Sequence, residues 1–425
     1  MLYRIIVAHP GKQHSYRIAS ALKKAGLLQY YVTTIYDKEI PSPIIKIIKK
    51  FLNSDNLKRA NSRRNPDLKD SDVVQFMEIN GLAEAFVTRI DHGRKIYGWL
   101  QRRDADLFGI KVARLAIKDN ADAVIMYDTN ALSCFRYLSD HAPSIKKIMD
   151  VSSAGRPYRK KIYEDECQKS GHNDLLDENP YMRNAKVMNR LKDEMSFSDY
   201  FLVPSSFVRE SLVFSGVKDS QILTVPYGAN IFSDITREEI LKSSPIHFLF
   251  IGNVNYNKGV PYILNAMSRI SCDCADLTVT GAYNKNDWFV KDNINRKNIN
   301  FTGLVTFDRI QMIYEKADVF LIPSFAEGMA QVGIEAMACG LPIICTINSG
   351  VSDLIEDGVN GFIIPAGDDD ALIEKMQWFI DHRDRIRSMG NEARRTAYKY
   401  SWSYYEKNVV SAIISIMENK DHQIS

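Results

Sequence analysis

Residues 319–345 read VFLIPSFAEGMAQVGIEAMACGLPIIC. The stretch opens with an apolar run of strand length, continues through a turn and then predicts a helix that reaches Cys339. Gly340 and Pro342 end that helix, because glycine favours a helix C-terminus and proline cannot continue one. A second strand, a turn and a third strand follow up to Pro365. This order of elements predicts an α/β fold with parallel strands.

The same pattern extends over the whole chain. Short apolar runs alternate with amphipathic segments, which is typical of doubly wound parallel sheets with helices on both faces. The strands that we predict are Tyr3–Ala8, Leu28–Thr33, Ala123–Tyr127, Lys147–Val151, Tyr200–Pro204, His247–Ile251, Leu277–Thr280, Val319–Pro323 and Pro342–Cys345. Such sheets bind ligands at the carboxyl ends of their strands, so we expect functional residues in the loops that follow them.

The length of 425 residues, with 45% hydrophobic and 25% charged residues, suits two globular domains. Residues 198–205 (SDYFLVPS) resemble residues 317–324 (ADVFLIPS), which favours two similar halves, although buried strands of α/β proteins in general share this pattern. Pro226 and Gly228, followed by polar residues, predict a crossover between the halves. We therefore expect domains at 1–235 and 236–400, followed by a C-terminal helix within 401–425.

The predicted C-terminal helix has one apolar stripe, formed by Trp402, Tyr405, Val409, Ile413 and Met417. That stripe must pack on another surface. It could cap the second domain or cross back to the first, and the periodicity favours neither.

Composition excludes several classes of protein. The 55 basic and 52 acidic residues leave a net charge of +3, so overall charge does not indicate a nucleic-acid partner. The six cysteines contain no C-x-x-C pair, which favours free thiols in a reducing compartment over disulfides or a zinc site. Residues 1–8 are too short an apolar run for a signal peptide, and no stretch approaches the roughly 18 apolar residues of a membrane-spanning helix. We expect a cytoplasmic protein.

Residues 43–64 are both apolar and basic. They could lie on an anionic membrane, which would make the protein peripheral at the inner membrane face. The alternative is a helix that packs on the core and exposes a basic edge.

Two acidic side chains flank the start of the predicted helix after residue 330. Glu327 lies just before the helix and Glu335 about two turns along it, while Gly328 lets a ligand approach backbone N–H groups that have no intrahelical partner. Those amides and the positive end of the helix dipole favour a phosphate. Carboxylates accept hydrogen bonds from sugar hydroxyls. The alternative is that both glutamates only stabilise the helix.

A second candidate loop follows the strand at 247–251 and reads GNVNYNKG from Gly252 to Gly259. Lys258 in this loop could neutralise a diphosphate as a mobile point charge, or it could be a solvated lysine.

A third candidate loop, residues 8–15, carries His9, Gly11 and His14 after the first strand. It lacks both G-x-G-x-x-G and G-x-x-x-x-G-K-[ST], which argues against a nicotinamide dehydrogenase and a P-loop NTPase.

Together these stretches resemble the retaining GT-B glycosyltransferases of family 4, which transfer a sugar from an activated nucleotide donor to an acceptor. The strongest element is the family's E-x7-E signature, matched by Glu327 and Glu335 and continued by AMACGLP at 336–342. Further landmarks follow in family order at 9–14, 226–228, 301–303, 317–319, 323–324 and 361–362. The resemblance covers most of the chain and implies an acceptor-side domain and a nucleotide-sugar-binding domain that face a central cleft.

The resemblance also implies roles for single residues. Glu327 would bind hydroxyls of the donor sugar, and Glu335 would bind the nucleotide ribose. Lys258 would hold the diphosphate, in a loop that begins with Gly252 and Asn253, and Lys258 and Glu327 are the expected catalytic residues.

The remaining donor contacts would come from backbone. The distal phosphate would bind the amides of Gly328, Met329 and Ala330, and the turn at Gly303 and Leu304 would lie near the base. On the acceptor side, the expected residues are Gly11, Lys12, His14 and Asp150.

Two departures from the family pattern stand out. Many relatives have arginine directly after the glycine of the second-domain strand, where this chain has Asn253, so one phosphate-binding cation is missing unless Arg156, Arg102 or Lys12 supplies it. Many relatives also have a histidine in the stretch that corresponds to residues 149–155, which contains none here. Asp150 or His14 could take its place.

The implied function is transfer of a sugar with retention of anomeric configuration, in the biosynthesis of a surface polysaccharide. The donor would be a nucleotide-diphosphate sugar, the acceptor a glycan or lipid-linked glycan, and no metal or other cofactor is expected. We prefer a front-face mechanism to a covalent intermediate on Glu327. The alternatives are a non-catalytic nucleotide-sugar-binding or scaffold protein and a glycogen-type phosphorylase that carries pyridoxal phosphate on a lysine.

Overall fold

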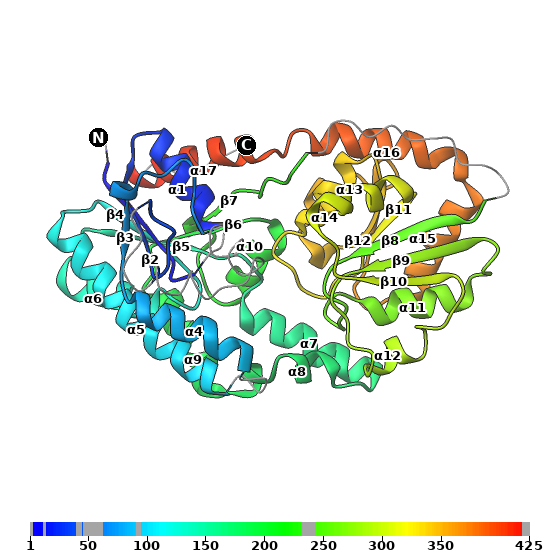
Figure 1. Cartoon of the computed structure of the whole chain (residues 1–425), viewed down its shortest axis with the longest axis horizontal. Coiled ribbons are helices and arrows are strands. Elements are labelled where there is room, and N and C mark those ends of the chain that lie inside the picture. Colours follow the sequence, from blue (N-terminus) through cyan, green and yellow to red (C-terminus); the bar gives the residue numbers. More distant parts are fainter. Residues whose placement is uncertain are drawn as a thin grey trace.

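A computed structural model describes residues 3–11, 14–39, 45, 63–90, 95–231 and 244–418. The chain forms two sheet domains that lie side by side, with the chain passing between them twice (Figure 1). The basic segment 43–64 lies outside the described residues except for Ile45, Arg63 and Arg64.

The first domain contains a seven-stranded parallel sheet with the order β3-β2-β1-β4-β5-β6-β7. Its strands are β1 (Ile5–Ala8), β2 (Leu28–Thr33), β3 (Val73–Gln75), β4 (Ala123–Tyr127), β5 (Lys146–Asp150), β6 (Tyr200–Val203) and β7 (Ile222–Thr224). Its helices are α1 (Ser15–Lys24), α4 (Glu78–Ile90), α5 (Lys95–Lys118), α6 (Leu132–His141), α7 (Arg156–Ser170), α8 (Asp174–Glu178), α9 (Ala185–Ser196) and α10 (Ser206–Phe214).

The second domain contains a six-stranded parallel sheet with the order β10-β9-β8-β11-β12-β13. Its strands are β8 (Ile246–Ile251), β9 (Ala275–Thr280), β10 (Ile299–Gly303), β11 (Val319–Ile322), β12 (Ile343–Thr346) and β13 (Gly361–Ile364). Its helices are α11 (Val260–Arg269), α12 (Trp288–Lys291), α13 (Phe307–Lys316), α14 (Gln331–Ala338), α15 (Asp369–Asp381) and α16 (Arg383–Ala397).

In both sheets the order of the strands reverses beside the first strand of the domain. The reversal lies between β1 and β4 in the first sheet and between β8 and β11 in the second. In open parallel sheets, ligands bind outside the carboxyl ends of the strands at such a switch point. The expected fold, two doubly wound parallel sheets, is confirmed. It places the loops after β1, β8 and β11 where a ligand would bind.

The nine predicted strands are present, with ends within two residues of the prediction, and the third strand predicted before Pro365 is β13. The strands β3, β7 and β10 were not predicted, and all three lie at sheet edges. An edge strand has a neighbour on one side only, so it tolerates short and mixed sequences such as INFTG in β10.

The C-terminal helix α17 (Trp402–Met417) crosses back and packs on α1 (Figure 1). Its Glu406 Oε2 lies 2.9 Å from Lys24 Nζ, and the Arg17 guanidinium lies 4.5 Å from the centre of the Trp402 ring. The apolar stripe of α17 joins the core that contains the buried face of α1. The first domain therefore consists of two separate parts of the sequence.

The two crossovers between the domains touch each other. Ala229 of the first crossover pairs with Ser401 of the second in an isolated parallel bridge. A Cβ atom on Gly228 would lie 2.6 Å from the Ser401 carbonyl oxygen, so only glycine fits there. The boundary expected at residue 235 lies outside the described residues.

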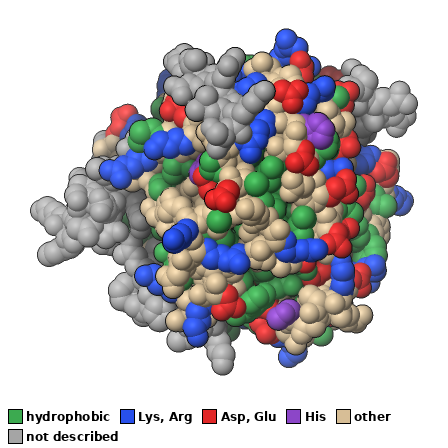
Figure 2. Space-filling model, turned by 90° about the vertical axis from the view of Figure 1, so that its right-hand side faces the viewer, with side chains coloured by type: hydrophobic (Ala, Val, Ile, Leu, Met, Phe, Trp, Pro, Cys, Tyr) green, Lys and Arg blue, Asp and Glu red, His purple; other side chains and the backbone are tan. Residues whose placement is uncertain are grey.

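Basic and acidic side chains are interspersed over the face of the molecule that Figure 2 shows, in line with the small net charge. Within the described part of the chain, no helix is both long and apolar enough to cross a membrane.

Candidate active site

The loop between β11 and α14 contacts the first domain directly. Ser205 Oγ donates a hydrogen bond of 2.6 Å to the Gly328 carbonyl. A Cβ atom on Gly328 would overlap the carbonyl oxygen of Ser152, so this position requires glycine. The loop that precedes α14 therefore lies at the interface of the two domains.

The helix α14 begins at Gln331, directly after the loop 324–330 that the sequence predicts to lead into it. The amides of Glu327 and Ala330 donate to the carbonyls of Asn348 and Ser349, at 3.0 and 3.2 Å. These bonds hold the loop in a non-helical course up to Ala330, so Glu335 lies about one turn into α14 rather than two. The prediction that the Ala330 amide is free is wrong, since this amide donates a hydrogen bond to the Ser349 carbonyl.

The two preceding amides have no such partner. Among the residues that the structure describes, none accepts a hydrogen bond from the backbone N–H of Gly328 or Met329. These donors adjoin the N-terminus of α14, where the helix dipole favours negative charge.

The loop with Lys258 packs on this segment. Gly259 has a φ angle of +71°, and a Cβ atom there would overlap the carbonyl of Pro323 at the end of β11. The Phe325 amide donates to the Asn257 carbonyl at 2.8 Å. This contact brings Lys258 Nζ and Glu327 Oε1 together in an ion pair, with 26% and 17% of the side chains exposed. A ligand diphosphate would have to share Lys258 with Glu327.

Glu335 lies beside the first crossover. Its Oε1 accepts a hydrogen bond of 3.2 Å from Asn230 Nδ2, and its Oε2 accepts one of 3.3 Å from the Tyr314 hydroxyl. Burial raises the pKa of Glu335, and these two donors act against that rise. The carboxylate is thus oriented by groups from both sides of the domain junction.

The other donor-side positions lie at strand ends. Gly252 and Asn253 follow β8, and the Asn253 side chain is exposed. Gly303 ends β10 with a φ angle of +72°, and Leu304 after it is 80% exposed.

On the first-domain side, the structure brings His14 and Asp150 together. His14 Nε2 lies 2.9 Å from Asp150 Oδ1 and 3.1 Å from the Tyr227 hydroxyl. The sequence leaves open which of the two could replace the missing histidine, and here they form one hydrogen-bonded pair. Lys12 lies outside the described residues.

Gly11 is held by His9. The Gly11 amide donates to His9 Nδ1 at 2.9 Å, and burial lowers the pKa of His9 to about 4. His9 is therefore neutral at pH 7 and fixes the loop rather than carrying charge.

Three tyrosines surround the His14–Asp150 pair, and sequence reasoning did not assign them to the site. The Tyr127 ring lies 5.1 Å from that of His14, the Tyr227 hydroxyl donates to Asp150 Oδ1 at 3.5 Å, and Tyr405 of α17 packs on Tyr227 at 5.7 Å. The Tyr127 hydroxyl is buried and has no partner among the described residues. Tyr127 ends a predicted strand, which was the one available signal for its position.

Arg156 and Arg102 are two of the candidates to replace the missing cation beside the donor loops. The Arg156 guanidinium lies 4.7 Å from the centre of the Tyr181 ring, and Arg102 is exposed on α5. No cluster of three or more metal-binding side chains occurs in the described ranges.

The two facing doubly wound sheets, with candidate ligand groups on both sides of their junction, define the GT-B fold of glycosyltransferases. Residues 245–382 match the family described as Glycosyl transferases group 1. The matched segment contains Lys258, Glu327 and Glu335.

Curated relatives that match part of the chain carry the name glycosyltransferase. The chain is 27% identical over 173 residues to an uncharacterized glycosyltransferase of Methanocaldococcus jannaschii, which covers 40% of this chain and 49% of that protein. It is 31% identical over 127 residues to a putative colanic acid biosynthesis glycosyltransferase of Salmonella typhimurium, covering 28% and 31%. The chain thus spans about half the length, or less, of the curated relatives that it matches.

Solved structures match over nearly the full length. The lipopolysaccharide outer core galactosyltransferase WaaB aligns with a TM-score of 0.65 at 14% identity, over 97% of this chain and 99% of that one. HepE of Anabaena, in complex with UDP, aligns with a TM-score of 0.60 at 12% identity, over 97% and 100%. At such identities the shared property is the fold.

Proposed function

We propose that this protein is a retaining glycosyltransferase of the family 4 type, which transfers a sugar from a nucleotide-diphosphate sugar to a glycan or lipid-linked glycan. The observation that carries the proposal is the Lys258–Glu327 ion pair beside the free amides of Gly328 and Met329. One cation and two amides stand where a leaving diphosphate gathers charge, and one carboxylate stands where it can accept hydrogen bonds from sugar hydroxyls.

The leaving group is stabilised in two ways. Lys258 neutralises the diphosphate as a point charge, and the amides of Gly328 and Met329 donate to its distal phosphate. These dipoles are fixed by the contacts to Ser205 and Asn348, so they need no reorganisation during the reaction. No metal is needed for this task, and we expect activity in the presence of a chelator.

The donor and the acceptor lie on opposite sides of the cleft. Glu335 binds the ribose, and the exposed Leu304 contacts the base. The His14–Asp150 pair faces the acceptor hydroxyl, and the acceptor attacks from the side that the leaving group vacates. The structure of HepE in complex with UDP supports uracil as the base of the donor nucleotide. The names of the Salmonella relative and of WaaB support a role in surface polysaccharide biosynthesis. The location that we propose is the cytoplasmic side of the membrane.

A panel of nucleotide sugars tests the proposal. One donor should raise the unfolding temperature, because a ligand that binds only the folded state stabilises it. Incubation of that donor with an acceptor should then give a product with the same anomeric configuration, measured by NMR of the anomeric proton. An inverted product would contradict the retaining assignment, and no stabilisation by any donor would contradict the function.

The exposed Asn253 favours a second candidate, a protein that binds nucleotide sugars without turnover. Binding of a donor with neither transfer nor hydrolysis would support it. The variant Asn253→Arg separates the two: a cation restored beside Lys258 should increase turnover in an enzyme and should create none in a binding protein.

A further inference from the structure

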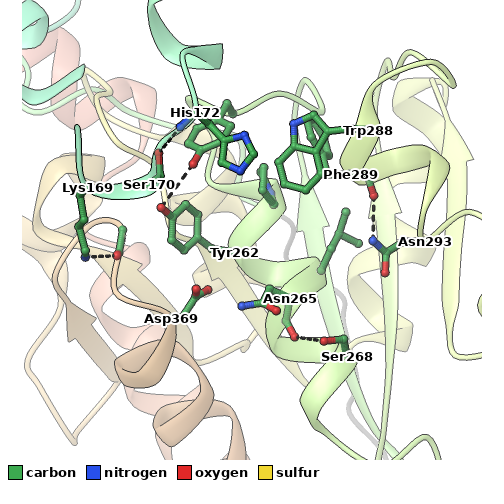
Figure 3. Close-up of a pocket in the computed structure, with 14 residues that line it drawn as sticks. Lys169, Ser170, His172, Tyr262, Asn265, Ser268, Trp288, Phe289, Asn293 and Asp369 are labelled. Carbon is green, nitrogen blue, oxygen red and sulfur yellow. Dashed lines mark hydrogen bonds between the residues drawn. The ribbon is translucent and has the colours of Figure 1, made fainter. Parts of the chain in front are cut away.

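A pocket lies on the seam between the domains, and its lining includes Tyr256 of the loop that carries Lys258. Its volume is about 430 Å³, within the range of about 300–1,000 Å³ that is usual for small-molecule sites. The end of α7 and the residues after it form one wall, and α11, α12 and the start of α15 form the others (Figure 3). None of the lining residues is among the donor-side or acceptor-side residues described above.

Aromatic rings line this pocket in fixed orientations. Trp288 is 43% exposed, its ring stacks on His172 at 4.9 Å with an interplanar angle of 10°, and its Nε1 donates to Asp174 Oδ1 at 3.3 Å. The Tyr262 hydroxyl donates to the buried carboxylate of Glu166. The partly exposed indole and the Tyr262 ring therefore present flat apolar surface without needing to reorient.

Amide and carboxylate groups point toward the same space (Figure 3). Asn293 uses its Nδ2 to donate to the Phe289 carbonyl at 2.9 Å, which leaves its Oδ1 as an acceptor. Asp369 and Asn265 lie side by side on the floor of the pocket, and the Asn265 side chain hydrogen-bonds to the Asp369 carboxylate. A carboxylate accepts several hydrogen bonds, so hydroxyl donors of a ligand can add to this contact.

The lysine and the carboxylate that line the pocket offset each other in formal charge, which favours a neutral ligand. The one lysine in its lining, Lys169, donates to the Gly367 carbonyl at 2.5 Å. The lining carboxylate, Asp369, would repel a phosphate or a carboxylate of a ligand. A fitting ligand is uncharged, has hydroxyl groups that donate and has apolar C–H faces that lie on aromatic rings.

We propose that this seam pocket binds a neutral saccharide, at a site separate from the one where transfer occurs. Trp288 and Tyr262 supply the apolar platform, and Asn265, Asn293 and Asp369 receive the hydroxyls. Because the first domain contributes Lys169, Ser170 and His172 and the second contributes the rest, a bound saccharide contacts both domains. The proposal does not rest on the transferase function, since it concerns binding alone.

The test uses the full chain without a nucleotide donor. Its four tryptophans give four indole N–H resonances, and the Trp288→Phe variant assigns one of them. The probes are the neutral tetrasaccharides maltotetraose, cellotetraose and N-acetylchitotetraose, each titrated to about 10 mM, a range that detects Kd values near 1 mM. At least one should shift the Trp288 resonance, and Trp288→Ala should weaken its binding about tenfold.

The controls keep folding and binding apart. Trp99 is also exposed, at 56%, but lies on α5 of the first domain, so Trp99→Ala should leave saccharide binding unchanged. Asp369→Asn keeps the shape of the side chain and should weaken binding several-fold, which covers the case in which Trp288→Ala does not fold. If none of the three tetrasaccharides perturbs Trp288, or if binding persists in both variants, the proposal is overturned. Saccharide binding without any response to nucleotide sugars would keep it and contradict the proposed function instead.

Discussion

The two sides of the domain junction are built in different ways. On the second-domain side, Lys258 and Glu327 come from two loops that pack on each other, and their opposite charges meet directly. On the first-domain side, His14 and Asp150 are 136 residues apart and form a direct hydrogen bond. The Tyr227 hydroxyl contacts this pair, and Tyr405 of the C-terminal helix packs on Tyr227. The second-domain side is therefore suited to charge stabilisation, and the first to orienting a hydroxyl group.

The strongest test of this difference is Lys258→Ala. It removes the single described cation that pairs with Glu327 and leaves the carboxylate without a partner. We expect kcat to fall about 10³-fold, since loss of one electrostatic stabiliser costs about 10²–10³ and the unpaired Glu327 would repel the diphosphate. Steady-state kinetics with the donor that gives a thermal shift measures the effect. Lys285→Ala, an exposed lysine of the same domain, is the matched control and should retain full activity.

An intermediate effect is expected for Asp150→Asn. The amide keeps the size of the side chain but cannot hold His14 as a charged acceptor does, so turnover should fall about 10–100-fold. Donor affinity should stay the same, because Asp150 lies on the acceptor side. The division between the two sides would fail if Asp150→Asn weakened donor binding in a thermal-shift titration as much as Lys258→Ala does.

The smallest effect concerns stability rather than turnover. Burial lowers the pKa of His9 from 6.5 to about 4, so the unfolded chain binds a proton at pH 5 and the folded chain does not. Stability that depends on neutral His9 is thus fully present above about pH 6.5 and is lost as the pH falls toward 4. Burial raises the pKa of Glu84 and Glu194 to about 7, which changes stability in the opposite direction in every variant, so the comparison is with His9→Gln. In denaturant unfolding, the change from pH 7 to pH 5 should be less favourable by about 1–3 kcal/mol in the wild type than in His9→Gln. An equal change in both proteins would contradict the assignment.

The difference between the second-domain side and the first-domain side also explains which site residues could be predicted from the sequence. Lys258, Glu327 and Glu335 lie in short segments where strand, turn and helix signals occur together, and the family pattern marks them by spacing alone. The surroundings of His14 depend on long-range packing, because Tyr227 and Tyr405 reach it from the first crossover and from α17. No local periodicity carries that information.

Details of hydrogen bonding escaped prediction for a related reason. The Ala330 amide is one of the groups expected to be free at a helix start, but the segment at 348–349 accepts hydrogen bonds from this loop. That segment follows β12, and the sequence indicates the strand without indicating which groups its following loop will contact. The helix start was thus predicted to within one turn, and the partners of its amides were not.

The return of α17 to the first domain also has a consequence for synthesis on the ribosome. Tyr405, Val409 and Ile413 belong to the same apolar core as Ile18 and Leu22 of α1. The nascent N-terminal half cannot bury that face of α1 until the last helix has left the exit tunnel. The second domain, by contrast, has all its strands once residue 364 has emerged. The half that is translated first is therefore the half that is completed last.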